Sequence, residues 1–240
     1  MDKLYIVMPA YNEEANIQSV VKQWHPVVEK IGEDSRLVIV NDGSKDSTYQ
    51  VLEKLTVSYP QLIALTKPNS GHGATCLYAY KYAIDNGADY IFQTDSDGQT
   101  DPEEFAPFWE QRADYDFLIG ARKDRQDGFS RIVVTKVLKL VVLFIFGEVI
   151  VDANTPFRLM RAKMLEGFLK EIPKDFFLSN VMVSVLAVSE KYRAKWIPIT
   201  FKPRQGGVNS INLKRIIKIG IKSVKDLNRV KRDLKRKKKE

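Results

Sequence analysis

The sequence of 240 residues is poor in the side chains that build disulfides and zinc sites, since it contains one cysteine, Cys76, and two histidines, His25 and His72. A lone cysteine excludes an intramolecular disulfide and a cysteine-based metal cluster. With only two scattered histidines beside it, the composition disfavours a zinc site of cysteine and histidine ligands. The same scarcity leaves few candidates for the base that a serine or cysteine nucleophile requires.

A long, uninterrupted hydrophobic run is also missing. Residues 132–151 are nearly long enough to span a bilayer, but two lysines and a glutamate interrupt them. We expect apolar helices within 129–151 that lie on a membrane interface, and a buried helix at a subunit or domain contact is the alternative. The short apolar run before Pro9 is not typical of a secretory signal peptide. The expected location is therefore cytoplasmic, peripheral at the inner face of the membrane.

Positive charge is concentrated at the end of the chain. Residues 214–240 contain 13 Lys or Arg against three acidic residues, a net +10; because the whole chain carries +8, the other 213 residues carry −2. Apolar residues at steps of three and four predict one helical face in this segment: Leu213, Ile217, Ile221, Val224, Leu227 and Leu234. We therefore expect one domain over 1–212 and a basic amphipathic tail over 213–240 that meets a membrane surface or a partner. Nucleic-acid binding is not expected, because the body lacks a basic groove with interleaved aromatic residues.

The first 120 residues alternate short apolar runs with helical patterns. Candidate strands occupy residues 4–8, 37–40, 62–65, 90–93 and 117–119, and candidate helices occupy 14–31, 47–58, 73–86 and 102–111. Strands that alternate with helices of this length indicate βαβ units. The predicted fold class is α/β, with a Rossmann-like, mostly parallel sheet flanked by helices.

Polar side chains follow four of these strands. They occupy segments 9–13 (PAYNE), 41–44 (NDGS), 94–99 (TDSDGQ) and 120–122 (GAR). The carboxyl ends of parallel strands meet at one edge of a sheet, where α/β proteins bind ligands. Each segment alone is explained as a turn or a helix cap. Four of them together predict a site at this edge.

Asp95 and Asp97 are the candidate metal ligands, and Gln99 adds a neutral oxygen within reach. Mg²⁺ and Mn²⁺ prefer oxygen ligands and often bind through one or two carboxylates plus substrate phosphates. Such an ion would neutralise the diphosphate of a nucleotide-sugar as it leaves. By itself, Asp-X-Asp is a weak signal because surface loops often contain it.

Two further segments are candidates for nucleotide contact. Asp42 could accept hydrogen bonds from a base or a ribose, and residues 69–73 (NSGHG) form a glycine-rich turn before a predicted helix. The backbone amides of that turn, including that of Gly73, could face a phosphate or the base. The segment matches neither the dinucleotide fingerprint nor the P-loop. For His72 alone, the sequence favours a role in the loop or at the helix start.

The four strand-end segments together resemble the ordered motifs of family 2 inverting glycosyltransferases, which have the GT-A fold. The later stretch resembles the dolichyl- and undecaprenyl-phosphate sugar synthases of that family, and the resemblance covers roughly residues 3–215. It implies that a sugar moves from a UDP- or GDP-sugar donor to a membrane-associated acceptor, with polyprenyl phosphate favoured. It also implies a divalent cation as cofactor.

The resemblance assigns roles to individual positions. Asp95, Asp97 and Gln99 match metal-binding positions. Residues 152–158 (DANTPFR) occupy the place of a loop that shapes the sugar and acceptor pocket. The implied nucleotide contacts are Pro9, Tyr11, Glu13, Asp42, Gly73, Asp95 and Ser96. The implied catalytic residues are Asp97, Arg122, Arg131 and Asp152, and the implied acceptor contacts are Arg131, Arg204 and Ser210.

The acceptor determines whether the reaction needs a base. A polyprenyl phosphate is already anionic near pH 7, and Arg122, Arg131 and Arg204 would position it. A hydroxyl of a lipid-linked or polymeric glycan would need a carboxylate base, for which Asp152 is the candidate. A turn or cap role for Asp152 is an equal alternative.

Other classes of function stay open. A nucleotidyltransferase or a dinucleotide oxidoreductase could use a similar sheet, although the oxidoreductase fingerprint is missing after the first strand. An adaptor that binds membranes or nucleic acid through the basic tail would leave Asp42, Asp95 and Asp97 unexplained. Many proteins of the resembled family continue into transmembrane helices, so a separate membrane-protein partner is a further hypothesis, as is a homo-oligomer.

Overall fold

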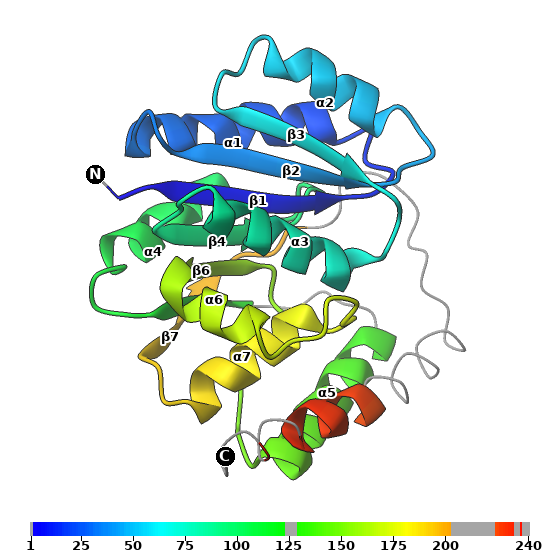
Figure 1. The fold of residues 1–240 in the computed structure, drawn as a ribbon, viewed down its shortest axis with the longest axis vertical. Helices are drawn as coiled ribbons and strands as arrows, with labels where there is room; N and C mark the ends of the chain where they lie inside the picture. The colour runs from blue at the N-terminus through cyan, green and yellow to red at the C-terminus, as the bar shows by residue number, and fades with distance from the viewer. Residues whose placement is uncertain (1, 123–128, 203–223, 233–235, 237–240) are drawn as a thin grey trace.

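The computed structural model describes residues 2–122, 129–202, 224–232 and 236, and only the backbone of 129–137. A seven-stranded sheet in the order β3-β2-β1-β4-β6-β5-β7 lies between two groups of helices (Figure 1). β6 is antiparallel to β4 and β5, and the other neighbouring pairs are parallel. The strands are β1 (Leu4–Ala10), β2 (Arg36–Asp42), β3 (Leu62–Lys67), β4 (Tyr90–Thr94), β5 (Phe117–Arg122), β6 (Phe157–Arg161) and β7 (Ala194–Ile199).

All five predicted strands are present, as β1 to β5, whereas β6 and β7 were not predicted. The prediction that 152–158 is a loop throughout is wrong at its end, because Phe157 and Arg158 pair with Thr94 and Gln93 of β4. β6 is only five residues long and begins and ends near arginines, so no apolar run marks it. Its antiparallel place between β4 and β5 comes from long-range pairing.

The predicted helices are present with shifted ends. They are α1 (Ile17–Ile31), α2 (Thr48–Thr56), α3 (His72–Asp85), the 3₁₀ turn η1 (Pro102–Phe105) with α4 (Ala106–Glu110), and α5 (Phe129–Phe146). The structure also contains α6 (Ala162–Leu169) and α7 (Ser179–Ser189), which were not predicted. The predicted helix over 102–111 is divided into η1 and α4. None of the helices formed by the described residues has both the length and the apolar character needed to cross a membrane.

Both faces of the sheet are buried, which explains why its parallel strands read as continuous apolar runs. Side chains alternate between the faces along each strand. In β1, Leu4 and Ile6 join the cluster beneath α1, whereas Tyr5 and Val7 join the cluster beneath α3, α6 and α7. The sheet is therefore a rigid, two-sided platform whose loops at one edge are free to carry function.

Phe92 is the centre of the first of these clusters. Its ring centroid lies 4.7 Å from that of Phe157, 4.9 Å from that of Phe105 and 5.5 Å from that of Trp24. Edge-to-face and tilted pairs of this kind add to the free energy gained by burial alone. They join α1, η1 and β6 directly to β4, the strand that leads into Asp95.

Residues 224–232 are helical and lie beside α5 (Figure 1). Leu227 and Val230 are buried in the same core cluster as Ile145 of α5, and the Lys231 ammonium donates a hydrogen bond to the Ile145 carbonyl. Part of the apolar face of the tail is therefore used within the molecule. The predicted boundary between residues 212 and 213 lies outside the described residues.

Replacing Phe92 by alanine should lower the free energy of unfolding by about 3–5 kcal/mol, because a fully buried aromatic side chain and its ring contacts are lost. Urea denaturation followed by circular dichroism measures this. Val57→Ala is the matched control, since Val57 is 86% exposed and its loss should change stability by no more than about 0.5 kcal/mol. Equal stability of the two variants would contradict the central place of Phe92.

Candidate active site

The loops after β1, β2 and β4 meet at one edge of the sheet. β1 pairs with β2 as far as Ala10 and Asn41, and with β4 on its other side. The Ser96 hydroxyl donates a 2.8 Å hydrogen bond to the Pro9 carbonyl and ties the loop after β4 to the end of β1. The structure therefore brings together the segments that the sequence places at strand ends.

In the loop after β1, Glu13 has a structural task. Its carboxylate accepts a 2.7 Å hydrogen bond from Asn16 Nδ2, and its carbonyl accepts the amides of Asn16 and Ile17 at the start of α1. Its own amide donates to Thr48 Oγ1 at 2.9 Å. Tyr11, in contrast, is 42% exposed at this edge. Contacts of Tyr11 and Glu13 with a nucleotide stay predictions.

The Asp42 carboxylate is buried and holds the turn that follows β3. It accepts hydrogen bonds from the Lys67 ammonium and from the amides of Ser70 and Gly71, each amide at 2.9 Å. Burial alone would raise the pKa of Asp42, but the hydrogen bonds from Lys67 and the Ser70 amide outweigh it and hold the pKa below its ordinary value. In this structure Asp42, the predicted nucleotide contact, thus holds the backbone of residues 67–71 in place.

Gly73 is the second residue of α3 and packs directly on backbone. A Cβ atom at this position would lie 2.2 Å from the Phe177 carbonyl oxygen and 2.4 Å from that of Phe176. Only glycine allows so close an approach. The structure thus gives a packing reason for Gly73, and its predicted contact with a nucleotide stays a prediction.

Asp95 and Asp97 follow β4 directly, and their surroundings fit a cation shared with a diphosphate. Asp95 Oδ2 receives no hydrogen bond from the described residues. The backbone amide of Gln99 donates to Asp97 Oδ1 at 3.1 Å. The Gln99 side chain donates through Nε2 to the Lys202 carbonyl, so its amide oxygen is the end available to a cation. No three acidic, histidine or cysteine side chains of the described part of the chain converge on one point. Two carboxylates with an amide oxygen suit an ion that completes its shell from substrate phosphates and water.

His72 lies against Asp95, one of the candidate metal ligands. The sequence did not predict this contact. Its Nε2 atom is 2.9 Å from Asp95 Oδ1, and Gln93 Nε2 donates to the same oxygen at 3.2 Å. The available signal was a histidine at a helix start on the predicted edge. Nothing in the sequence relates that position to residue 95, which is 23 positions further along.

On the other side of the edge, Arg122 at the end of β5 forms a bidentate ion pair with Asp152. Arg122 Nε donates to Asp152 Oδ2 at 2.8 Å and Nη2 donates to Oδ1 at 2.9 Å, and the side chains are only 10% and 8% exposed. The guanidinium also lies 5.2 Å from the centre of the Phe201 ring. The candidate base is therefore already bound through both oxygens.

Arg158 of β6 is a fully buried cation. Its guanidinium donates to the carbonyls of Thr155 at 2.6 and 3.1 Å, of Asn180 at 2.8 Å and of Ala153 at 3.3 Å. These bonds hold the 153–155 turn against α7. The sequence motif contained Arg158 but gave no sign that it is buried.

The side chains of all three predicted acceptor contacts lie outside the described residues. The side chain of Arg131 and the whole of Arg204 and Ser210 lie outside the described residues. Their roles stay predictions. Of the predicted catalytic residues, Asp97, Arg122 and Asp152 are described, and the last two contact each other.

The chain is similar in sequence to known proteins. The sequence model of the family described as glycosyl transferase family 2 matches residues 5–169. Polyprenol monophosphomannose synthase of Mycolicibacterium smegmatis is 24% identical over 216 residues, which cover 86% of this chain and 80% of that protein. Undecaprenyl-phosphate 4-deoxy-4-formamido-L-arabinose transferase of Salmonella paratyphi B is also 24% identical, over 90% of this chain, but the chain spans only 65% of that relative's length.

The fold is also shared with solved structures. Glucosyl-3-phosphoglycerate synthase from Mycobacterium tuberculosis, in complex with Mn²⁺, UDP and glucosyl-3-phosphoglycerate, superposes with a TM-score of 0.68 at 15% identity. The match covers 95% of this chain and 80% of that one. The same enzyme with Mn²⁺, UDP-glucose and phosphoglyceric acid gives a TM-score of 0.69 over 96% of this chain and 80% of that one, again at 15% identity. At this identity the likeness shows the fold alone.

Replacing Asp42 by asparagine should lower the free energy of unfolding at pH 7 by about 2 kcal/mol, because hydrogen bonds to a buried charge are lost. The lowered folded-state pKa means that this contribution is present above the unfolded pKa of about 3.9. It is lost as the pH falls through the folded-state value.

Urea denaturation of wild type and Asp42→Asn at pH 7 and at pH 3 measures the effect. The difference between the two proteins should shrink at the lower pH. Asp34→Asn is the control, because the Asp34 side chain is 73% exposed and its change should matter by at most about 0.5 kcal/mol. A difference for Asp42→Asn that is the same at both pH values would contradict the stabilising role of its charge.

Proposed function

The chain belongs to glycosyl transferase family 2, and from that premise we propose that it transfers a sugar from a nucleoside-diphosphate donor to a polyprenyl phosphate at a membrane surface. The family and the α/β fold predicted from the motifs are confirmed. The names of both relatives contain a polyprenyl carrier, which supports the acceptor class. The observation that carries the proposal is the pair Asp95 and Asp97 at the carboxyl end of β4, beside the ends of β1 and β2.

The expected cofactor is a divalent cation, either Mg²⁺ or Mn²⁺. Asp95, Asp97 and the amide oxygen of Gln99 would hold it, and when bound it neutralises charge on the departing diphosphate. The complexes of glucosyl-3-phosphoglycerate synthase contain Mn²⁺ together with UDP or UDP-glucose, which supports a divalent cation and a nucleoside-diphosphate donor.

The proposed transfer is a single displacement with inversion at the anomeric carbon. A bond forms between an acceptor phosphate oxygen and the anomeric carbon, while the bond from that carbon to the donor phosphate oxygen breaks. The bonding electron pair leaves with the nucleoside diphosphate. The residues at the sheet edge would orient the two anions in line rather than supply a covalent intermediate.

The Arg122–Asp152 ion pair favours a phosphate acceptor over a hydroxyl. Both oxygens of the Asp152 carboxylate already accept charge-assisted hydrogen bonds from Arg122, so the candidate base is poorly placed to meet an acceptor hydroxyl. A phosphate nucleophile is already an anion near pH 7 and requires no base. Arg122 would then bind the acceptor anion, together with the predicted acceptor contacts Arg131, Arg204 and Ser210.

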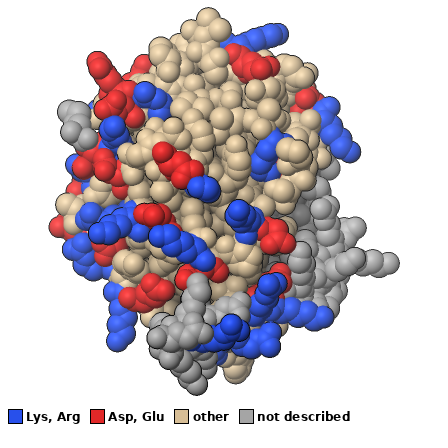
Figure 2. Space-filling model, viewed as in Figure 1, with Lys and Arg blue, Asp and Glu red and all other residues tan. Residues whose placement is uncertain are grey.

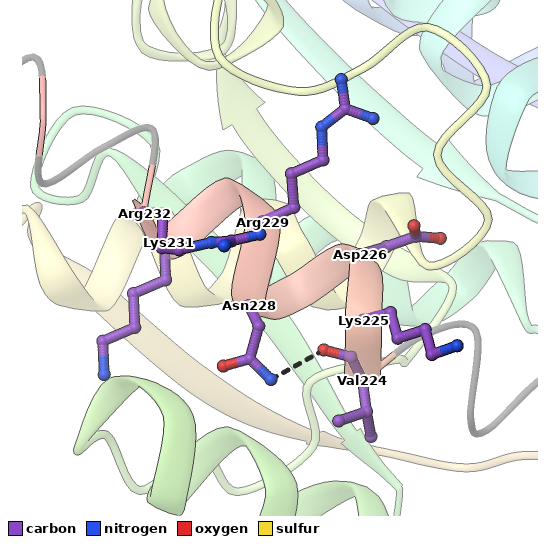
Figure 3. Close-up of a pocket in the computed structure, with 7 residues that line it drawn as sticks. All are labelled: Val224, Lys225, Asp226, Asn228, Arg229, Lys231 and Arg232. Carbon is purple, nitrogen blue, oxygen red and sulfur yellow. Dashed lines mark hydrogen bonds between the residues drawn. The ribbon is translucent and has the colours of Figure 1, made fainter.

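We further propose that the molecule meets the bilayer through α5 and the loop after it. Large apolar side chains are exposed there: Leu140, Leu143, Phe144, Val149 and Val151, with Phe144 at 82% and Val149 at 79%. The neighbouring segment 224–232 carries Lys225, Arg229, Lys231 and Arg232, which line an open hollow of about 720 Å³. Their side chains leave the helix in different directions (Figure 3). Figure 2 shows Lys and Arg at this end of the molecule and also elsewhere on the same face.

Apolar side chains beside cations are typical of a surface that binds anionic lipids. Val151 immediately precedes Asp152, so the apolar surface reaches the proposed acceptor site. A peripheral position at the inner face of the membrane follows as part of the proposal. A membrane-protein partner and a homo-oligomer remain hypotheses that co-purification from membranes would test.

The donor site predicts metal-dependent nucleotide binding. UDP or GDP with Mn²⁺ should raise the melting temperature of wild type, and at 100 times the Kd the gain is about 2.7 kcal/mol. Asp97→Ala should abolish the metal-dependent part of the shift. Differential scanning fluorimetry with UDP, GDP, CMP and NAD measures this, with Asp34→Ala as the control for loss of an exposed acid. A shift that is equal in Asp97→Ala, or absent for every nucleotide, would overturn the proposed function.

The membrane surface predicts that Phe144→Glu combined with Val149→Glu weakens binding to phosphatidylglycerol-containing vesicles by at least about tenfold. Burial of each such apolar side chain is worth about 1.5–3 kcal/mol, and charges oppose it. Vesicle co-sedimentation measures binding, and nucleotide-induced stabilisation should be unchanged. Val57→Glu is the matched control, because Val57 is equally exposed but follows α2, away from α5. Wild-type binding by the double variant would exclude this surface.

A further inference from the structure

His72 is aimed at Asp95 by backbone that is fixed on both of its sides. On the N-terminal side, the amides of Ser70 and Gly71 donate to the Asp42 carboxylate, and Gly71 adopts a φ of +88°. On the C-terminal side, Gly73 packs against the carbonyl of Phe177 without room for a Cβ atom. His72 is the first residue of α3 between these two contacts, so its Cα position is set independently of any contact that its ring makes.

The His72 ring contacts Oδ1 of the Asp95 carboxylate and does not contact Oδ2. His72 Nε2 and Gln93 Nε2 both lie within hydrogen-bond distance of Oδ1, at 2.9 and 3.2 Å. Two such contacts on one oxygen restrict the rotation of the carboxylate about its side-chain bond. Among the described residues none donates to Oδ2, which is therefore the oxygen presented to a ligand.

A role for His72 as a metal ligand is not favoured by this arrangement. His72, Asp95 and Asp97 do not converge on a common point, since no group of three such side chains in the described chain could hold one ion. Imidazole nitrogen also suits zinc and copper better than it suits Mg²⁺ or Mn²⁺, for which oxygen is preferred. A hydrogen-bond donor to a ligating carboxylate fits both the distance and the chemistry.

We propose that His72 is a positioning residue for the donor site: by donating from Nε2 to Asp95 Oδ1, it orients the carboxylate so that Oδ2 faces the cation and the donor diphosphate. The inference deepens the proposed function and rests on it. The proposed transfer itself gives His72 no role, and this inference gives it one.

The test compares His72→Leu, which removes the donor, with His72→Gln, whose side-chain amide can donate to the same oxygen. Mn²⁺ affinity is measured by electron paramagnetic resonance of the free ion, on the full chain and in the presence of UDP or of GDP. His72→Leu should weaken Mn²⁺ binding by about 10- to 100-fold, as is usual when a hydrogen-bond partner of a ligand is lost, and His72→Gln should restore most of it.

Folding is controlled on the same helix. The His72 side chain is 46% exposed, so neither substitution opens a cavity in the core. Tyr78→Leu, at another exposed position of α3, should bind Mn²⁺ as wild type does. Wild-type affinity in His72→Leu would overturn the inference, and so would His72→Gln that is as weak as His72→Leu. Failure of wild type itself to bind Mn²⁺ with either nucleotide would overturn the proposed function, a result distinguishable from both.

Discussion

The geometry of the donor edge depends on the hydrogen bonds to the Asp42 carboxylate. A buried charge is tolerated only when it is paired and hydrogen-bonded, so the turn after β3 has to close onto the end of β2 and supply the amides of Ser70 and Gly71. That closure determines where α3 begins. It therefore carries His72 to Asp95, and it links three segments that are distant in sequence through one contact. The Asp42 carboxylate, which the sequence predicts as a nucleotide contact, therefore holds the backbone at the edge of the site.

Arg158 is a buried cation that holds the backbone near Arg122 and Asp152. Asp42 holds the backbone near Asp95 in the same way. Burial lowers the pKa of Arg158, but a guanidinium stays charged at neutral pH. Its donors have to be satisfied, and the carbonyls of Thr155, Asn180 and Ala153 satisfy them. The 153–155 turn is thereby drawn onto α7. Asp152 is left where both of its oxygens meet Arg122, and the two sides of the site are each fixed by a desolvated charge.

The sequence predicted those parts of the fold and the site that are encoded locally. β1 to β5 are marked by apolar runs, and Asp95 and Asp97 by their place directly after one of them. The missed parts arise from pairing between distant segments. β6 has two arginines in five residues and is a strand only because β4 and β5 flank it. The contact of His72 with Asp95 and the ion pair of Arg122 with Asp152 likewise depend on tertiary closure, and neither residue type nor spacing distinguishes them from ordinary loop positions.

An acceptor that binds Arg122 would compete with Asp152 for the guanidinium, so the charge of the acceptor matters at this site. Asp152 already binds the guanidinium through two hydrogen bonds, so a neutral hydroxyl offers Arg122 nothing that it lacks. A phosphate monoester carries a charge of about −1.5 to −2 near pH 7 and can bind the same planar fork, while its charge repels Asp152. Val151, which directly precedes Asp152 in the chain, is 54% exposed on the apolar surface. Because one stretch of backbone carries both the partner of Arg122 and the apolar surface, a phosphate attached to a lipid suits this site better than a soluble sugar hydroxyl.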